Sequence, residues 1–150
     1  MDLESREDRA IPIELPSDRI RHRPRIEDAS RTLESYRLSG DGKRIAVSAR
    51  GELWIRPVDG GRGVQLTRSP GVRERAPASA SDGERIACIT DELGEQQLAL
   101  LDAAGKGARE VLELDRSGWM NPPAWSPKGA HLAWSDLTQT LFVMDVESRE

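Results

Sequence analysis

The chain has 150 residues, of which 37% are hydrophobic and 32% are charged, with a formal net charge of −4. This length suits one domain of about 100–200 residues, and the mixed charges and short apolar runs argue against wholesale disorder. No apolar stretch approaches the roughly 18–20 residues of a membrane span, and one cysteine with two histidines excludes a disulfide framework and a Cys- or His-rich metal cluster.

Residues 1–35 predict an irregular N-terminal connector. The segment Met1–Asp8 is acidic and lacks the apolar core of a secretory signal, so we expect a cytoplasmic protein. The segment Ala10–Pro16 alternates apolar and polar residues. An edge strand is one alternative there, because Pro12 cannot donate a hydrogen bond to a neighbouring strand.

Four arginines alternate within Arg19–Ile26 and would share one face of an extended chain. Such a stripe is typical of nucleic-acid binding, but the whole chain is negatively charged and only 4% of its residues are aromatic. A solvated connector, whose arginines pair with carboxylates such as Glu27 and Asp28, fits better. We expect neither a nucleic-acid nor a membrane partner.

One pattern occurs three times after the connector: a polar turn with a glycine, followed by a short apolar run. The copies are Leu38–Ser48, Ser79–Thr90 and Trp125–Ser135, and their aligned glycines are Gly42, Gly83 and Gly129. These glycines lie 41 and 46 residues apart (83 − 42 and 129 − 83). Periods in the forties fit four-stranded propeller blades, in which each repeat forms one twisted antiparallel sheet.

The segments between the turns predict strands, because they are short apolar runs spaced about 8–12 residues apart. They are Arg44–Ser48, Leu53–Arg56 and Val64–Thr67 in the first repeat, Arg85–Thr90, Leu98–Leu101 and Val111–Leu114 in the second, and Leu141–Met144 in the third. Taken alone, Asp91–Leu114 has a helical composition. The repeat register and the glycines Gly94, Gly105 and Gly107 favour strands there.

The repeats predict an all-β fold: a partial β-propeller with two complete four-stranded blades, at about residues 36–75 and 76–121, and a truncated third at 122–150. Propellers usually close with about 4–8 blades, so this chain cannot close a ring by itself. The open blade edges would invite pairing. We therefore expect a piece of a longer protein or an incomplete gene product, and self-association through the open blade edges.

The repeated turn followed by Arg-Ile-Ala resembles the repeats of the Tol-system propeller and of peptidases that carry similar propellers. The order of features from Ile11 to Ser148 is more specific and resembles the second propeller of tricorn-type proteases, in peptidase family S41. The segments that carry this resemblance are Ile13–Arg19, Tyr36–Arg44, Ala49–Leu53 and Gln65–Arg75. In that family a separate C-terminal core performs catalysis, a PDZ-like domain precedes it, and the propellers gate or channel peptides. The resemblance thus implies a serine-type parent hydrolase, with peptides or the remainder of that protease as partners.

Three turns depart from the family's pattern. Gly40 stands in place of proline in the first turn, Lys128 in place of aspartate in the third, and Ser79–Gly83 lacks the tryptophan and the proline. These changes remove an aromatic anchor and some turn rigidity, so we expect loose packing in blade two.

The residues with reactive side chains do not form a catalytic set. The two candidate bases are His22, within the arginine run, and His131, which occupies the strand position of Arg44 and Arg85. Cys88 lies in an apolar strand and predicts a buried structural thiol. We therefore predict no catalytic, cofactor-binding or metal-binding residue in this chain, and no cofactor.

Two glycine clusters, Gly60–Gly63 and Gly105–Gly107, lack the phosphate-loop pattern and predict hairpin turns. Asp91, Glu92 and Glu95 miss the spacing of a calcium loop and predict a solvated blade loop.

Three tryptophans, Trp54, Trp125 and Trp134, fall in predicted strands and are expected to anchor the core. Trp119 lies in the connector between blades two and three. A ligand-facing aromatic is the alternative to core packing at that position.

The leading hypothesis is a non-catalytic propeller segment of a tricorn-like cytoplasmic serine protease, which contributes to peptide access, gating or assembly in proteolysis. The alternative is a stand-alone, propeller-type protein-binding module that closes a ring by oligomerisation. A fragment should be polydisperse, whereas an assembling module should give one sharp oligomeric mass.

Overall fold

The computed structural model describes residues 12–13, 28–107, 109–114 and 118–149. Within them the chain forms the strands β1–β11 and one short 3-10 helix, Ala29–Thr32. Most of the connector predicted at residues 1–35, including His22 and the arginine run, lies outside the described residues.

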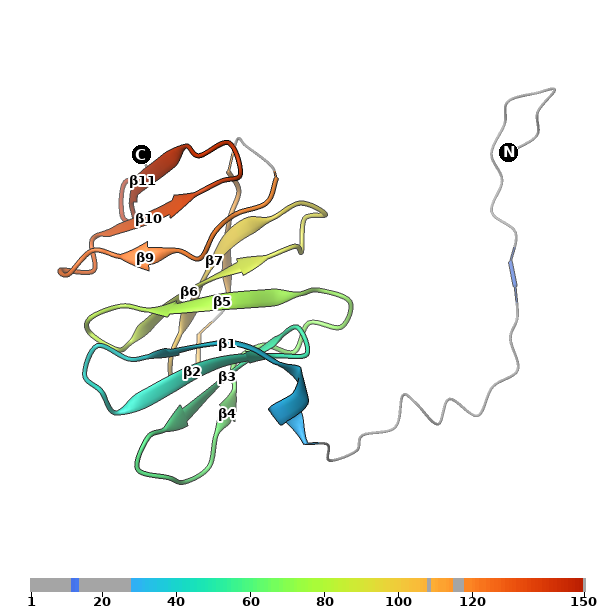
Figure 1. The fold of residues 1–150 in the computed structure, drawn as a ribbon, viewed down its shortest axis with the longest axis vertical. Coiled ribbons are helices and arrows are strands. Elements are labelled where there is room, and N and C mark those ends of the chain that lie inside the picture. Colours follow the sequence, from blue (N-terminus) through green and yellow to red (C-terminus); the bar gives the residue numbers. More distant parts are fainter. Residues whose placement is uncertain (1–11, 14–27, 108, 115–117, 150) are drawn as a thin grey trace.

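The strands form three antiparallel sheets, in each of which neighbours in sequence are neighbours in the sheet. Blade one comprises β1 (Leu33–Leu38), β2 (Arg44–Ala49), β3 (Glu52–Pro57) and β4 (Val64–Gln65). Blade two comprises β5 (Glu74–Ser79), β6 (Arg85–Thr90), β7 (Gln97–Asp102) and β8 (Glu110–Leu112). Blade three comprises β9 (Ala124–Trp125), β10 (His131–Ser135) and β11 (Leu141–Asp145). The blades stack in chain order, and the first strands β1, β5 and β9 lie side by side (Figure 1).

Adjacent first strands are typical of blades arranged around a propeller axis. The predicted fold, a partial propeller with two complete blades and a truncated third, is therefore confirmed. The helical alternative for Asp91–Leu114 is wrong, because β7 and β8 lie in that segment.

The repeated turn has the same backbone conformation in each blade. Gly42, Gly83 and Gly129 have φ values of 70°, 70° and 69°. The amide of each glycine donates to the carbonyl oxygen three residues earlier, at 2.9, 3.0 and 2.9 Å. Glycine adopts this left-handed φ without strain, so its place in the sequence pattern fixes the hairpin.

Blade two is buried on both faces of its sheet. Along β6, Ile86 and Cys88 pack toward blade one, whereas Ala87 and Ile89 pack toward blade three. Successive side chains of a strand point to opposite faces, so an apolar run can pack against a neighbouring blade on each side. Every residue of β6 after Arg85 is buried. The expectation of loose packing in blade two is wrong, because the two adjoining blades supply the contacts.

Gly40 marks a close approach between the turns of blades one and two. A Cβ atom at Gly40 would lie 2.7 Å from both the Cα and the carbonyl oxygen of Ser81.

We expect Gly40→Ala to lower the free energy of unfolding by about 1–3 kcal/mol, because the added methyl group would push the two turns apart. Urea denaturation measures this change. Gly63→Ala is the matched control, since its nearest neighbour would be the Ile55 carbonyl oxygen at 3.4 Å. Equal losses at both glycines would contradict the steric explanation.

Candidate functional site

Arginines at the start of the second strands link neighbouring blades. The guanidinium of Arg44 (β2) donates to the carbonyl oxygen of Gly83 in blade two. The guanidinium of Arg85 (β6) donates to the carbonyl oxygen of Gly129 in blade three at 2.8 Å, and lies 4.9 Å from the centroid of the Trp125 ring. Each arginine therefore binds the turn of the next blade. We call these the inter-blade arginine contacts.

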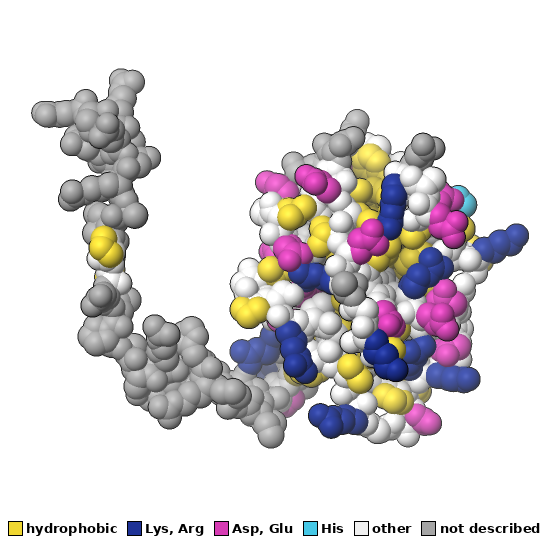
Figure 2. Space-filling view, turned by 180° about the vertical axis from the view of Figure 1, so that it is seen from behind, with side chains coloured by type: hydrophobic (Ala, Val, Ile, Leu, Met, Phe, Trp, Pro, Cys, Tyr) yellow, Lys and Arg dark blue, Asp and Glu magenta, His cyan; other side chains and the backbone are white. Residues whose placement is uncertain are grey.

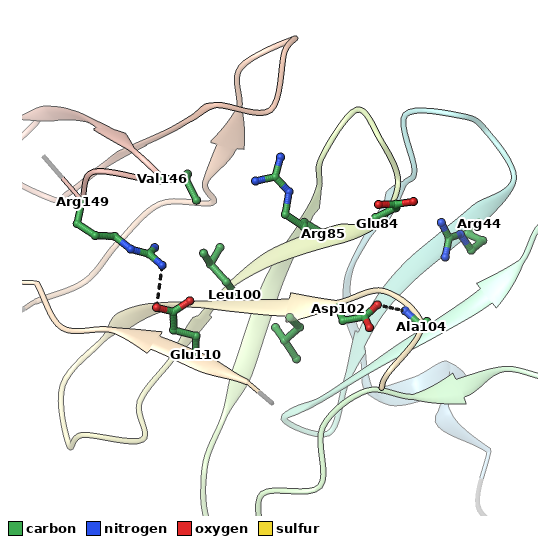
Figure 3. Close-up of a pocket in the computed structure, with 10 residues that line it drawn as sticks. Arg44, Glu84, Arg85, Leu100, Asp102, Ala104, Glu110, Val146 and Arg149 are labelled. Atoms are coloured by element: carbon green, nitrogen blue, oxygen red, sulfur yellow. Dashed lines mark hydrogen bonds and ion pairs between the residues drawn. The ribbon is translucent and has the colours of Figure 1, made fainter. Parts of the chain in front are cut away.

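A cavity of about 720 Å³ lies beside these arginines (Figure 3). Its apolar lining includes Leu100, Leu101 and Val146, and its charged lining residues are Arg44, Glu84, Arg85, Asp102, Glu110 and Arg149. Arg149 pairs with Glu110 at 2.7 Å across blades three and two. Because both signs of charge line the cavity, its chemistry suits a dipolar ligand such as a peptide chain better than a polyanion.

A buried ion-pair cluster joins the start of β5 to the residue before β8. The side chain of Glu74 is 0% exposed and pairs with Arg109, which also pairs with Glu92 at 2.6 Å. Arg109 donates to the Ser69 hydroxyl at 3.0 Å as well. Burial raises the pKa of the Glu74 carboxyl above its usual range, and the charge of Arg109 opposes this shift. The contacts tie separate segments of the chain together, which is a structural role.

Arg75 and Trp119 meet near the first strands of blades two and three. The Arg75 guanidinium carbon lies 4.2 Å from the centroid of the Trp119 ring, a cation–π arrangement. The same guanidinium donates to the Gln96 side-chain oxygen and the Met120 carbonyl oxygen, both at 2.9 Å. Trp119 nevertheless remains 47% exposed. The pair thus presents an oriented aromatic surface beside the inner strands, as the ligand-facing alternative for Trp119 requires.

The reactive residues singled out by sequence lie apart. His131 begins β10, its side chain is 49% exposed, and its Nε2 lies 3.6 Å from the Asp145 Oδ2. Cys88 is buried in β6 of another blade, and burial raises the pKa of its thiol. Both positions agree with the predicted roles of strand surface residue and buried thiol.

The glycine clusters and the acidic loop also lie where the sequence predicts. Gly60–Gly63 connects β3 to β4, and Gly105–Gly107 follows β7 before β8. Asp91, Glu92 and Glu95 are exposed. Among the residues that the structure describes, no group of three or more His, Cys, Asp or Glu side chains is placed to hold a metal ion.

The tryptophans divide between the core and the surface. Trp125 and Trp134 pack against the core between blades two and three, and Trp134 stacks on Phe142 with ring centroids 5.5 Å apart. Trp54 is 40% exposed, so its predicted role as a core anchor is wrong. It lies on the sheet face of blade one that points away from blade two, where no described element covers it.

Acidic and basic side chains are interspersed over the face of the molecule drawn in Figure 2. This distribution differs from the single-sign stripe that binds a nucleic-acid backbone. In the described part of the chain, no helix is long and apolar enough to cross a membrane.

Comparison with known sequences gives one relative for almost the whole chain. The chain is 29% identical over 142 residues to tricorn protease homolog 2 of Streptomyces coelicolor, a match that covers 92% of this chain and 12% of that protein. The chain therefore spans a small part of the length of the curated relative that it matches. No protein-family model matches the chain.

Solved structures share the fold. TolB from Acinetobacter baumannii matches with a TM-score of 0.69 and 16% identity, covering 81% of this chain and 32% of that chain. The tricorn protease matches with a TM-score of 0.55 and 15% identity, covering 68% of this chain and 11% of that chain. The relative and these structures support the resemblance to a tricorn-type propeller segment.

Proposed function

We propose that this chain is a non-catalytic propeller segment of a tricorn-like serine protease, a cytoplasmic hydrolase of peptidase family S41. Its role is to contribute to peptide access, gating or assembly rather than to cleave bonds. The observation that carries the proposal is the match of 92% of the chain to 12% of a tricorn protease homologue. A chain that matches so small a share of its relative would form one accessory part of a larger protein.

The geometry supports a peptide-contacting role through Arg75 and Trp119. Exposed aromatic rings contribute much of the energy of peptide binding, and an arginine that holds the ring reduces the entropy lost on contact. Both residues lie near first strands, which are the strands closest to a propeller axis. A peptide that passes along this axis would meet the pair.

The test measures hydrolysis and binding separately on the purified chain. We expect no cleavage of unstructured peptides, and weak binding that Trp119→Ala reduces about tenfold, as titration calorimetry would show. Val64→Ala is the control, because Val64 is also exposed but lies in β4, the strand of blade one farthest from β1. Reproducible peptide cleavage would refute the non-catalytic role, and absence of peptide binding would refute the role in access.

The second candidate function is a stand-alone binding module that closes by oligomerisation. The observation that favours it is the exposure of large apolar side chains at both ends of the blade stack, with Tyr36 63% and Leu141 70% exposed. Large apolar side chains that are exposed together on one sheet face are typical of interaction surfaces.

A further inference from the structure

The two ends of the blade stack present sheet faces on which exposed apolar side chains lie beside a few polar ones, such as Arg56 in β3 and Ser135 in β10. At one end, β1, β2 and β3 place Tyr36, Leu38, Ile45, Val47 and Trp54 on the side away from blade two, and we call this the blade-one outer face. At the other end, β10 and β11 place His131, Ala133, Leu141, Val143 and Asp145 on the side away from blade two, and we call this the blade-three outer face. Leu141 and Val143 are 70% and 60% exposed.

The blade-one outer face repeats the positions by which blade three contacts blade two. In blade one, Val47 is paired in register with Trp54. The equivalent pair in blade three is Trp134 with Phe142, whose stacked rings lie on the side facing blade two. The blade-one outer face is thus built like a surface that receives a preceding blade.

The blade-three outer face repeats the positions by which blade two contacts blade three. Val143 pairs with Ala133 as Leu100 pairs with Ala87 in blade two. Leu141 likewise occupies the position of Leu98, which is 0% exposed because blade three covers it. Leu141 and Val143 are therefore exposed at positions that, in blade two, hold residues buried against the next blade.

Polar contacts point to the same pairing of the two ends. Arg44 and Arg85 each donate to the turn glycine of the following blade, Gly83 and Gly129. The equivalent donor on blade three is His131, and no blade follows it among the residues that the structure describes.

The equivalent acceptor on blade one is the carbonyl oxygen of Gly42. A Cβ atom added at Gly42 would meet nothing within 4 Å, whereas one at Gly83 would lie 3.2 Å from the Arg44 guanidinium. A cavity of about 540 Å³ opens at this turn, lined in part by Gly42, Pro57 and Val58. The turn therefore has room for an incoming donor side chain.

We propose that two copies of this chain associate head to tail, with the blade-three outer face of each against the blade-one outer face of the other. His131 of one copy then takes the place of the inter-blade arginines and approaches the Gly42 carbonyl of its partner. Two copies supply six blades, within the usual range of about 4–8, whereas three copies would supply nine. The two identical contacts close under a two-fold axis, so the assembly stops at a dimer. The inference rests on the second candidate function.

The oligomeric mass of the full chain is the first readout. Analytical ultracentrifugation across a wide range of concentrations should show a monomer–dimer equilibrium. The double variant Leu141→Asp with Val143→Asp should raise the dimer dissociation constant at least about a hundredfold, because each buried apolar anchor contributes about tenfold or more. Leu137→Asp is the matched control, since Leu137 is 71% exposed but lies in the turn between β10 and β11. Circular dichroism confirms that the variants remain folded.

A mixing experiment separates head-to-tail from other pairings. Trp54→Asp on the blade-one outer face should also abolish the dimer. A mixture of the Trp54→Asp variant with the Leu141→Asp, Val143→Asp variant should recover a dimer, because one of its two contacts joins unaltered faces. Pairing of like faces would give no such recovery.

His131→Arg should lower the dissociation constant of the dimer roughly threefold to tenfold, because a guanidinium is the donor at the other two blade contacts.

A monomer at every concentration, a polydisperse aggregate, or a mixture that fails to recover the dimer would each overturn the proposal. A polydisperse aggregate would also favour the protease-segment hypothesis, whereas the assays of peptide binding and cleavage test that role without reference to the oligomeric mass.

Discussion

Leu98→Ala is expected to lower the free energy of unfolding by about 2–5 kcal/mol, as urea denaturation followed by circular dichroism would show. Leu98 lies in β7, is 0% exposed, and packs in the core between blades two and three with Ile89, Leu132 and Met144. Removing its side chain loses the transfer free energy of the buried methyl groups and leaves a cavity that two rigid sheets cannot fill. The effect is large because the Leu98 side chain packs against residues of both blade two and blade three.

Leu137→Ala is the control for the change in residue type. Leu137 is 71% exposed in the β10–β11 turn, so this substitution should alter the free energy of unfolding by no more than about 0.5 kcal/mol. Similar losses for Leu98→Ala and Leu137→Ala would mean that the interface between blades two and three does not hold the fold together.

Arg109→Met is expected to lower the free energy of unfolding by about 3–5 kcal/mol near neutral pH, because it leaves the Glu74 carboxylate buried without its ion-pair partner. The Glu74 side chain is 0% exposed, whereas Glu92, the other partner of Arg109, is 37% exposed. Most of the loss therefore comes from Glu74. The double variant Glu74→Gln with Arg109→Met should recover much of it, because the buried charge is then removed.

The loss caused by Arg109→Met should depend on pH in a defined direction. Burial raises the pKa of Glu74, so the folded chain binds this proton more readily than the unfolded chain does. The contribution of Glu74 to stability is thus fully present at pH values below 4.5, its ordinary pKa, and is lost as the pH rises through the raised value. Removing Arg109 raises the pKa further, since the cation opposes the shift. The difference between wild type and variant should therefore grow as the pH rises above 4.5 and shrink on acidification. A difference that is independent of pH would exclude Glu74 as its cause.

The strands could be predicted from the sequence because their determinants are local. The turn glycines require a left-handed φ, and the apolar runs that follow them are short, so hairpins form at Gly42, Gly83 and Gly129. The repeat register outweighed helical propensity in Asp91–Leu114, because the strand β7 gains more from burial between two blades than an isolated helix gains from propensity.

The candidate site was only partly predictable. Trp119 stood out as an aromatic in a connector, but its partner Arg75 lies far from it in sequence, and no local pattern indicates the pair. The cluster of Glu74, Glu92 and Arg109 likewise joins residues from three separate segments. Nothing in the spacing of these charges distinguishes them from solvated ones.

The sequence by itself determined the number of blades in the described residues, the strands that follow each repeated turn, and the turns themselves. Periodicity and glycine geometry act over a few residues, and each blade repeats them. Only the tertiary structure decided which face of each blade is covered. Trp54 in β3 and Phe142 in β11 occupy equivalent strand positions and are both aromatic, yet Phe142 stacks on Trp134 on the side facing blade two, whereas Trp54 is exposed. Burial depends on whether a neighbouring blade lies against that face, and this is a property of how sheets stack rather than of any one repeat.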